Sequence, residues 1–297
     1  MKAYDCQIVF DPMLQGEENI DTSSKSKVVF VRSGSRELLK NYRYKQPLIS
    51  NQDRELALYM QKNVYVEENR LWAFEVAEVA TFFWKEGEER VTYICGEQYS
   101  DDLLKYWAIH TVTPLFFTIA GRYDFLHAGS VKIDEGVLLL VAESFGGKST
   151  LTDFFLKQGH ALLSDDKVGT YIKNGSAYAV PSHPYHRPYR QMEDLGYLAE
   201  HTVKEPQPIH AIYALQKCAP DSPVKIRALH GVEKFTALRS SSEINLTFLK
   251  EKRFTYLSRI AKIVPVFEVS VPWGIEYLGD VYEEICMHIR ASYQKGK

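Results

Sequence analysis

The residues with the clearest chemical meaning lie in one short segment, residues 142–150, which reads AESFGGKST. Its second half, Gly147-Lys148-Ser149, matches the end of the phosphate-loop pattern GxxxxGK[ST], although Ala142 stands where the first glycine is expected. The N–H groups of such a loop and the start of the next helix attract triphosphate oxygens. Lys148 would contact the β- and γ-phosphates, and Ser149 would bind Mg²⁺. The residues expected to contact the nucleotide are Ser144, Phe145, Gly146, Gly147, Lys148, Ser149 and Thr150.

Two adjacent carboxylates, Asp165 and Asp166, end a short apolar strand at residues 160–164, one helix after this loop. If that strand runs parallel to the strand before the loop, both carboxyl ends lie at one edge, where such sheets bind ligands. Neighbouring strand residues point in opposite directions, so the two carboxylates can divide two tasks. We expect Asp165 to act as general base toward an attacking hydroxyl and Asp166 to hold Mg²⁺. A solvated Asp-Asp turn is the alternative.

The elements around these motifs predict an α/β fold with a mixed sheet. Residues 125–133 and 137–141 are typical of a strand hairpin, and residues 149–158 of a helix that stops at Gly159. Residues 169–180 predict a second hairpin around Asn174-Gly175. Hairpins that flank a central β-loop-α-β unit do not fit the regular alternation of an all-parallel sheet.

The chain divides, by these patterns, into two regions. Residues 1–98 read as short strands, such as QIVF, KVVFVR and VTYIC, and predict a β-rich N-terminal region. Residues 99–297 are expected to form the phosphate-loop kinase domain. Asp101 and Asp102 open a helix at its start, and Pro114 is expected to interrupt that helix.

Composition narrows the classes of partner and compartment. The 297 residues carry a formal net charge of −2, which gives no basic field for nucleic acid or an anionic membrane. The four cysteines are far apart and form no CxxC pair, and no apolar stretch approaches a membrane span. We therefore expect a cytoplasmic protein with reduced thiols, with no nucleic-acid or membrane partner.

Four segments taken together resemble the HPr kinase/phosphorylase superfamily, most of all its small divergent HPr-kinase-like serine kinases. They are LHAGS (126–130), SFGGKST (144–150), GHALLSDD (159–166) and VPSHPYHRPYR (180–190). The resemblance implies a fold related to phosphoenolpyruvate carboxykinase, with a catalytic role for His127 near the transferred phosphate. It also implies that Arg187 matches an arginine following the Asp-Asp hairpin. Residues 190–196 lack the glycine-rich signature of bifunctional members, which argues against HPr as substrate and against a reverse phosphorylase activity.

The resulting hypothesis is a Mg²⁺-dependent kinase that uses ATP, with GTP left open. It would transfer the γ-phosphoryl group to a serine on a peptide or protein, such as the precursor of a ribosomally made lasso peptide. Arg187 and Arg190 are expected to bind the acceptor or its phosphate. A kinase of free serine or another small hydroxyl compound, and a non-catalytic nucleotide-binding switch, stay open, as does homo-oligomerisation. His183 and His186 form an H-x-x-H spacing among prolines, which has weak metal-binding meaning.

Overall fold

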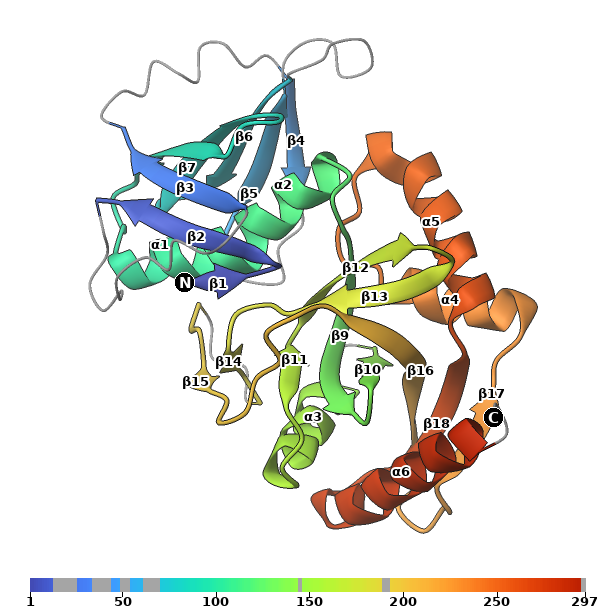
Figure 1. Ribbon diagram of the computed structural model, residues 1–297. Coiled ribbons are helices and arrows are strands. Elements are labelled where there is room, and N and C mark those ends of the chain that lie inside the picture. The colour runs from blue at the N-terminus through green and yellow to red at the C-terminus, as the bar shows by residue number, and fades with distance from the viewer. Residues whose placement is uncertain are drawn as a thin grey trace. The chain divides into compact units, whose positions relative to one another are not determined.

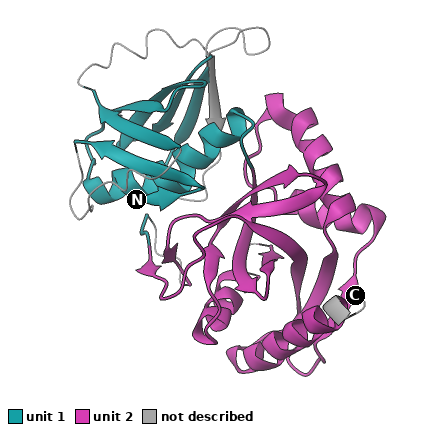
Figure 2. Ribbon diagram, viewed as in Figure 1, with its two compact units in different colours: residues 1–123, 191–195 teal, residues 124–190, 196–297 magenta. Residues whose placement is uncertain are grey.

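The computed structural model describes residues 1–12, 26–33, 44–48, 54–60, 70–143, 146–188 and 193–294 (Figure 1). The chain divides into two compact units, which Figure 2 shows in separate colours. Unit 1 comprises residues 1–123 and 191–195, and unit 2 comprises residues 124–190 and 196–297. Helices and strands occur together, and the sheets combine parallel with antiparallel pairs, so the predicted α/β class with mixed sheets is confirmed.

Unit 1 is built on one eight-stranded sheet with the order β1-β2-β3-β8-β7-β6-β5-β4. The pairs β2–β3 and β3–β8 are parallel, and the other neighbours are antiparallel. Large aromatic side chains fill its interior, and Phe30, Trp72 and Phe82 have no exposed area. The strands are β1 (Lys2–Ala3), β2 (Cys6–Asp11), β3 (Lys27–Arg32), β4 (Tyr44–Leu48), β5 (Leu56–Met60), β6 (Leu71–Val76), β7 (Ala80–Lys85) and β8 (Arg90–Cys95).

Unit 1 continues past residue 98, where we placed the end of the N-terminal region. Three helical segments follow β8, and the Phe116 ring within them stacks on Trp84 of β7 at a centroid distance of 4.8 Å. This contact joins the helical segment to the N-terminal sheet, so the boundary between the units falls after Tyr123. The segments are α1 (Asp101–Trp107), a π-helical turn η2 (Ala108–Val112) and α2 (Thr113–Ile119).

Pro114 does not interrupt this helical run, contrary to our expectation. It lies in the first turn of α2, where the missing N–H of proline costs least. The π-helical turn directly before it changes the hydrogen-bond register, and the Thr113 hydroxyl donates to the Ala108 carbonyl at 2.8 Å. The helical axis therefore continues through the proline.

Unit 2 holds a second sheet, in the order β10-β9-β12-β13-β16-β18-β17, with β11 also paired to β9. β10 and β11 both run antiparallel to β9, so they are parallel to one another with β9 between them. β10, β16 and β18 form parallel pairs. The strands are β9 (Asp124–Ile133), β10 (Gly136–Ala142), β11 (Leu162–Ser164), β12 (Lys167–Lys173), β13 (Ser176–Val180), β16 (Gln207–Cys218), β17 (Lys225–Ala228) and β18 (Val266–Pro272), and a separate two-stranded pair joins β14 (Tyr185–His186) to β15 (Tyr197–Leu198).

Helices cover both faces of this sheet because the apolar residues of β10 point alternately to either side. Leu138 and Leu140 belong to a core cluster with residues of α3 and α6. Val137, Leu139 and Val141 belong to a second cluster with residues of α4 and α5 (Figure 1). The helices are α3 (Lys148–Lys157), α4 (Gly231–Ser240), α5 (Lys250–Ile263) and α6 (Leu278–Gln294), with short 3₁₀ turns η3 (Thr247–Leu249) and η4 (Ile275–Tyr277).

The local predictions for unit 2 are confirmed. The hairpin expected over residues 125–141 forms β9 and β10, and α3 follows the loop within one residue of its expected start. Asn174 and Gly175 both have positive φ, as a two-residue hairpin turn between β12 and β13 requires. In the described part of the chain, no helix has the length and apolar character needed to cross a membrane.

Candidate active site

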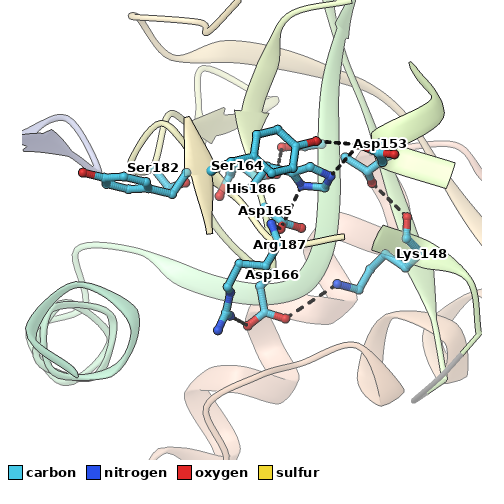
Figure 3. A network of polar contacts seen from close by, with 12 residues as sticks. Lys148, Asp153, Ser164, Asp165, Asp166, Ser182, His186 and Arg187 are labelled. Carbon is cyan, nitrogen blue, oxygen red and sulfur yellow. Dashed lines mark hydrogen bonds and ion pairs between the residues drawn. The ribbon is translucent and has the colours of Figure 1, made fainter. Parts of the chain in front are cut away.

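The topology of unit 2 brings the end of β10, which leads into the loop before α3, and the paired aspartates to one edge of the sheet. β10 ends at Ala142 and β11 at Ser164, and the two parallel strands have their carboxyl ends on the same side. The Lys148 ammonium consequently lies 3.7 Å from Oδ1 of Asp166 (Figure 3). The two motifs that the sequence placed one helix apart thus meet in space.

Two glycines explain the path of the loop into α3. Gly147 precedes the helix with φ +85°, a left-handed conformation that side-chain-bearing residues avoid. A Cβ on Gly146 would lie 2.6 Å from the Cβ of Ala142, so no larger residue fits there. The chain therefore turns tightly at Gly146-Gly147, directly before α3 begins. Ser144 and Phe145, which we expected to contact nucleotide, lie outside the described residues.

Lys148 is buried at the start of α3. Only 6% of its surface is accessible, and its charge is paired with Asp166. A buried ammonium requires such a partner, because an isolated charge is costly to remove from water. Ser149 and Thr150 follow on the first turn of α3 and are half-buried.

The Asp166 carboxylate contacts three cationic or protonatable side chains. Besides Lys148, its carboxylate lies 3.2 Å from Nδ1 of His127 and 3.3 Å from Nη2 of Arg187. Burial opposes ionisation, but the charge of Lys148, followed by the contacts with His127 and Arg187, outweighs it and holds the pKa of Asp166 far below its usual range. Asp166 is therefore a firmly ionised carboxylate, which suits binding of a cation better than proton uptake.

Asp165 occupies a different environment from its neighbour. Its Oδ2 atom lies 3.0 Å from Nδ1 of His186 and accepts the backbone N–H of Arg187 at 2.9 Å (Figure 3). Burial raises the pKa of Asp165, and the His186 contact and the Lys148 charge bring it below its ordinary value. Its other oxygen, Oδ1, is buried and accepts no hydrogen bond from the described residues. One oxygen is thus fixed and the other remains free to accept a proton.

His127 and Glu243 extend the cluster on the β9 side. The His127 backbone N–H donates to the Ser241 carbonyl at 2.6 Å, which brings the chain after α4 alongside β9. Nδ1 of His127 consequently lies 3.3 Å from Oε2 of Glu243, and Lys167 pairs with the same carboxylate at 3.1 Å. Burial would raise the pKa of Glu243, but Lys167 and His127 lower it to about 2.

His186 joins the aspartates to the phosphate-loop helix. Its ring is fully buried, and Nε2 lies 3.7 Å from Oδ1 of Asp153 on α3 (Figure 3). Asp153 also pairs with Lys157 at 2.7 Å and accepts the Tyr197 hydroxyl at 2.5 Å. Burial raises the pKa of Asp153, and these two hydrogen bonds lower it further than burial raises it. His186 therefore bridges two ionised carboxylates.

The two histidines of the H-x-x-H spacing have different partners. His186 contacts Asp165, whereas Nδ1 of His183 accepts the backbone N–H of Tyr185 at 3.3 Å. Burial, followed by the nearby charge of Arg187, lowers the pKa of His183 to about 4, so this ring is neutral. Over the described residues, no group of three or more His, Cys, Asp or Glu side chains is arranged to hold a metal ion.

The structure gathers most of the residues predicted for the site. Lys148, Asp165, Asp166, His127 and Arg187 belong to one connected set of contacts, while Arg190 lies outside the described residues. Sequence reasoning missed Asp153, Lys167 and Glu243, and it treated His186 only as a weak metal candidate. Lys167 directly follows the aspartates, so its charge could have been noticed in the sequence. Glu243 has no such local signal, because backbone contacts between residues 241–243 and β9 place it.

Comparison with solved structures gives distant structural likenesses. No family model matches the sequence, and no curated protein matches it. Among the solved structures that match is the Hpr(Ser) kinase/phosphatase from Coxiella burnetii, with a TM-score of 0.35 and 18% sequence identity. The match covers 58% of this chain and 97% of that chain. The relationship is distant, and nothing about the activity of this chain follows from it.

Proposed function

We propose that this protein is a phosphotransferase that moves the γ-phosphoryl group of a nucleoside triphosphate to a hydroxyl group, with a serine as acceptor. The observation that carries the proposal is the meeting of Lys148, at the start of α3, with Asp166, next to Asp165. A loop that presents helix N–H groups binds phosphate, and an adjacent pair of carboxylates supplies what phosphoryl transfer needs beyond binding.

The residues divide the work as follows. When the nucleotide binds, the Lys148 ammonium moves from Asp166 to the β- and γ-phosphates. There it offsets the negative charge that the phosphate oxygens carry in the transition state. Oδ1 of Asp165 takes the proton of the acceptor hydroxyl while Oδ2 stays fixed by His186 and Arg187. The acceptor oxygen then bonds to the γ-phosphorus, the bond to the β-phosphate oxygen breaks, and a nucleoside diphosphate leaves.

The residues present fit one Mg²⁺ ion. Magnesium is usually held by one or two carboxylates together with substrate phosphates and waters, and not by an all-protein cage. The ionised carboxylate of Asp166, with the Ser149 hydroxyl, meets that requirement. Held by Asp166 and Ser149, Mg²⁺ would offset the negative charge of the transferring phosphate groups.

His127 and Arg187 would donate hydrogen bonds to the transferred phosphoryl group. Both contact Asp166 before substrate binds, at 3.2 and 3.3 Å, and both carry donors suited to phosphate oxygens. Arg187 also ties the segment after β13 to the aspartates through its backbone. We therefore expect the acceptor to enter along residues 181–188, and a serine in a peptide or protein is the proposed acceptor, with ATP as the proposed donor.

The deep position of Asp165 favours a second acceptor class. Its carboxylate is only 3% exposed, and a small hydroxyl compound such as free serine would reach Oδ1 with less rearrangement than a folded protein. The non-catalytic switch is less favoured, since a pure nucleotide binder has no need of a carboxylate oxygen left free to accept a proton.

The deciding experiment incubates the protein with Mg²⁺–ATP and a mixture of serine-containing peptides, HPr and free serine, followed by mass spectrometry. Lys148→Met serves as control, because methionine preserves the buried stem and removes only the charge. A phosphorylated product formed by the wild type and not by this variant supports the proposal and names the acceptor class. Product formation at wild-type rate by Lys148→Met would falsify the assigned role of the lysine.

A further inference from the structure

Trp273 differs from every other tryptophan in the chain. Trp72, Trp84 and Trp107 are buried, with at most 6% of their surface exposed, whereas 52% of Trp273 is exposed. Burial of such a ring would remove a large apolar area from water, so its exposure at one defined place calls for an explanation. Trp273 lies in unit 2, directly after β18.

The position of Trp273 is at the phosphate-loop edge of the sheet. β10, β16 and β18 are parallel, so Ala142, Cys218 and Pro272 end their strands at the same edge. The Trp273 N–H donates to the Cys218 carbonyl at 3.3 Å, which holds the residue at this edge. A Cβ placed on Gly147 would lie 4.0 Å from Cζ3 of Trp273. The exposed ring thus borders the last residue before α3.

Lys217 orients the ring. Its ammonium lies 3.6 Å from the centroid of the Trp273 ring, in a cation–π contact. A single contact of this kind holds the aromatic plane while half of the side chain remains accessible. The same ammonium adds positive charge beside the loop, where a triphosphate carries its negative charge.

We propose that Trp273 is the stacking platform for the base of the bound nucleotide. The inference rests on the proposed function, because it takes the triphosphate to lie in the loop before α3. A triphosphate held there leaves its nucleoside outside the loop, and a planar base binds most readily on an exposed aromatic face. Stacking does not read the hydrogen-bonding edge of a base, so Trp273 accepts adenine and guanine alike.

The experiment measures binding of Mg²⁺–ATP, Mg²⁺–GTP and Mg²⁺–tripolyphosphate by calorimetry. Tripolyphosphate presents the same phosphates without a base, so it separates the contribution of Trp273 to affinity from that of the loop. Trp273→Ala should weaken both nucleotides by about tenfold or more, and leave tripolyphosphate unchanged. Trp273→Phe should retain most of the nucleotide affinity. Ile275→Ala, which removes another exposed side chain two residues further on, is the matched control and should bind like the wild type.

Four results would overturn the inference. If Trp273→Ala binds ATP as tightly as the wild type does, Trp273 does not bind the base. The same conclusion follows if the wild type binds ATP and tripolyphosphate equally tightly. In both cases the proposed function survives, because the loop still binds triphosphate. Failure of the wild type to bind any of the three ligands removes the proposed function and the platform together. Intact ATP binding by Trp273→Ala with lost acceptor phosphorylation would assign Trp273 to the acceptor instead.

Discussion

Nδ1 of His186 lies 3.0 Å from Oδ2 of Asp165, and the two side chains are buried together. An ionised carboxylate only accepts hydrogen bonds, so Nδ1 must carry the proton that joins them. Because Nε2 of the same ring faces Asp153 on α3, the contact couples the proposed base to the helix that follows the phosphate loop.

This coupling predicts that the two nitrogens of His186 differ in importance. His186→Asn places an amide near the position of Nδ1 and should keep the contact with Asp165, whereas His186→Gln reaches toward Asp153 instead. We expect His186→Gln to lower kcat by about 100-fold, as a displaced catalytic group does, with little change in the KM for nucleotide. His186→Asn should remain within a few-fold of the wild type. Steady-state kinetics of both variants check this, and similar losses in both would indicate a purely structural ring.

The two aspartates should respond differently to loss of charge. Asp165→Asn should lower kcat by about 10²- to 10⁴-fold without changing the Mg²⁺ concentration that gives half-maximal rate, because it removes a general base. Asp166→Asn should raise that Mg²⁺ concentration, because it removes the ionised carboxylate assigned to the metal. Magnesium titrations of the phosphorylation rate measure both effects. The opposite pattern would exchange the two roles.

Gly147 should be required for nucleotide binding. Its φ of +85° is unfavourable for any residue with a Cβ, so Gly147→Ala should cost about 1 kcal/mol and shift the loop N–H groups away from the phosphates. Gly121→Ala is the matched control, since Gly121 has φ +67° and open space around it in unit 1. Thermal unfolding should report a similar loss of stability for both variants. Only Gly147→Ala should lose affinity for Mg²⁺–ATP in calorimetry.

Glu243 makes stability depend on pH in the acid range. Its pKa falls from an ordinary 4.5 to about 2 in the folded chain, so folding favours the ionised form. The corresponding stabilisation is complete above the unfolded pKa and is lost as the pH falls from about 5 toward 2. Glu243→Gln should therefore flatten the decline of the unfolding free energy between pH 5 and pH 3, as measured by urea denaturation. Glu233→Gln, which alters an exposed pair with Arg227, should leave the slope unchanged.

Much of the local structure followed from short-range patterns. The apolar run of β10, the glycines before α3 and the Asn174-Gly175 turn each impose a backbone geometry on a few consecutive residues. Such preferences depend on the types of adjacent residues and need no distant partner. The helical run through Pro114 was predicted wrongly, because a π-helical turn precedes the proline and places it in the first turn of α2. The stacking of Phe116 on Trp84, which joins this segment to the N-terminal sheet, could not be predicted from short-range patterns.

Residue types within one β-loop-α-β stretch were enough to predict the glycine turn before α3, the paired aspartates and the order of the elements that carry them. The tertiary structure alone decided which aspartate is deeply buried, that His186 bridges Asp165 and Asp153, and that Glu243 reaches His127. The physical reason is that these contacts are set by sheet register and by the packing of elements distant in the chain. Burial and charge pairing, which fix the ionisation of each carboxylate, depend on the same packing and leave no trace in local sequence.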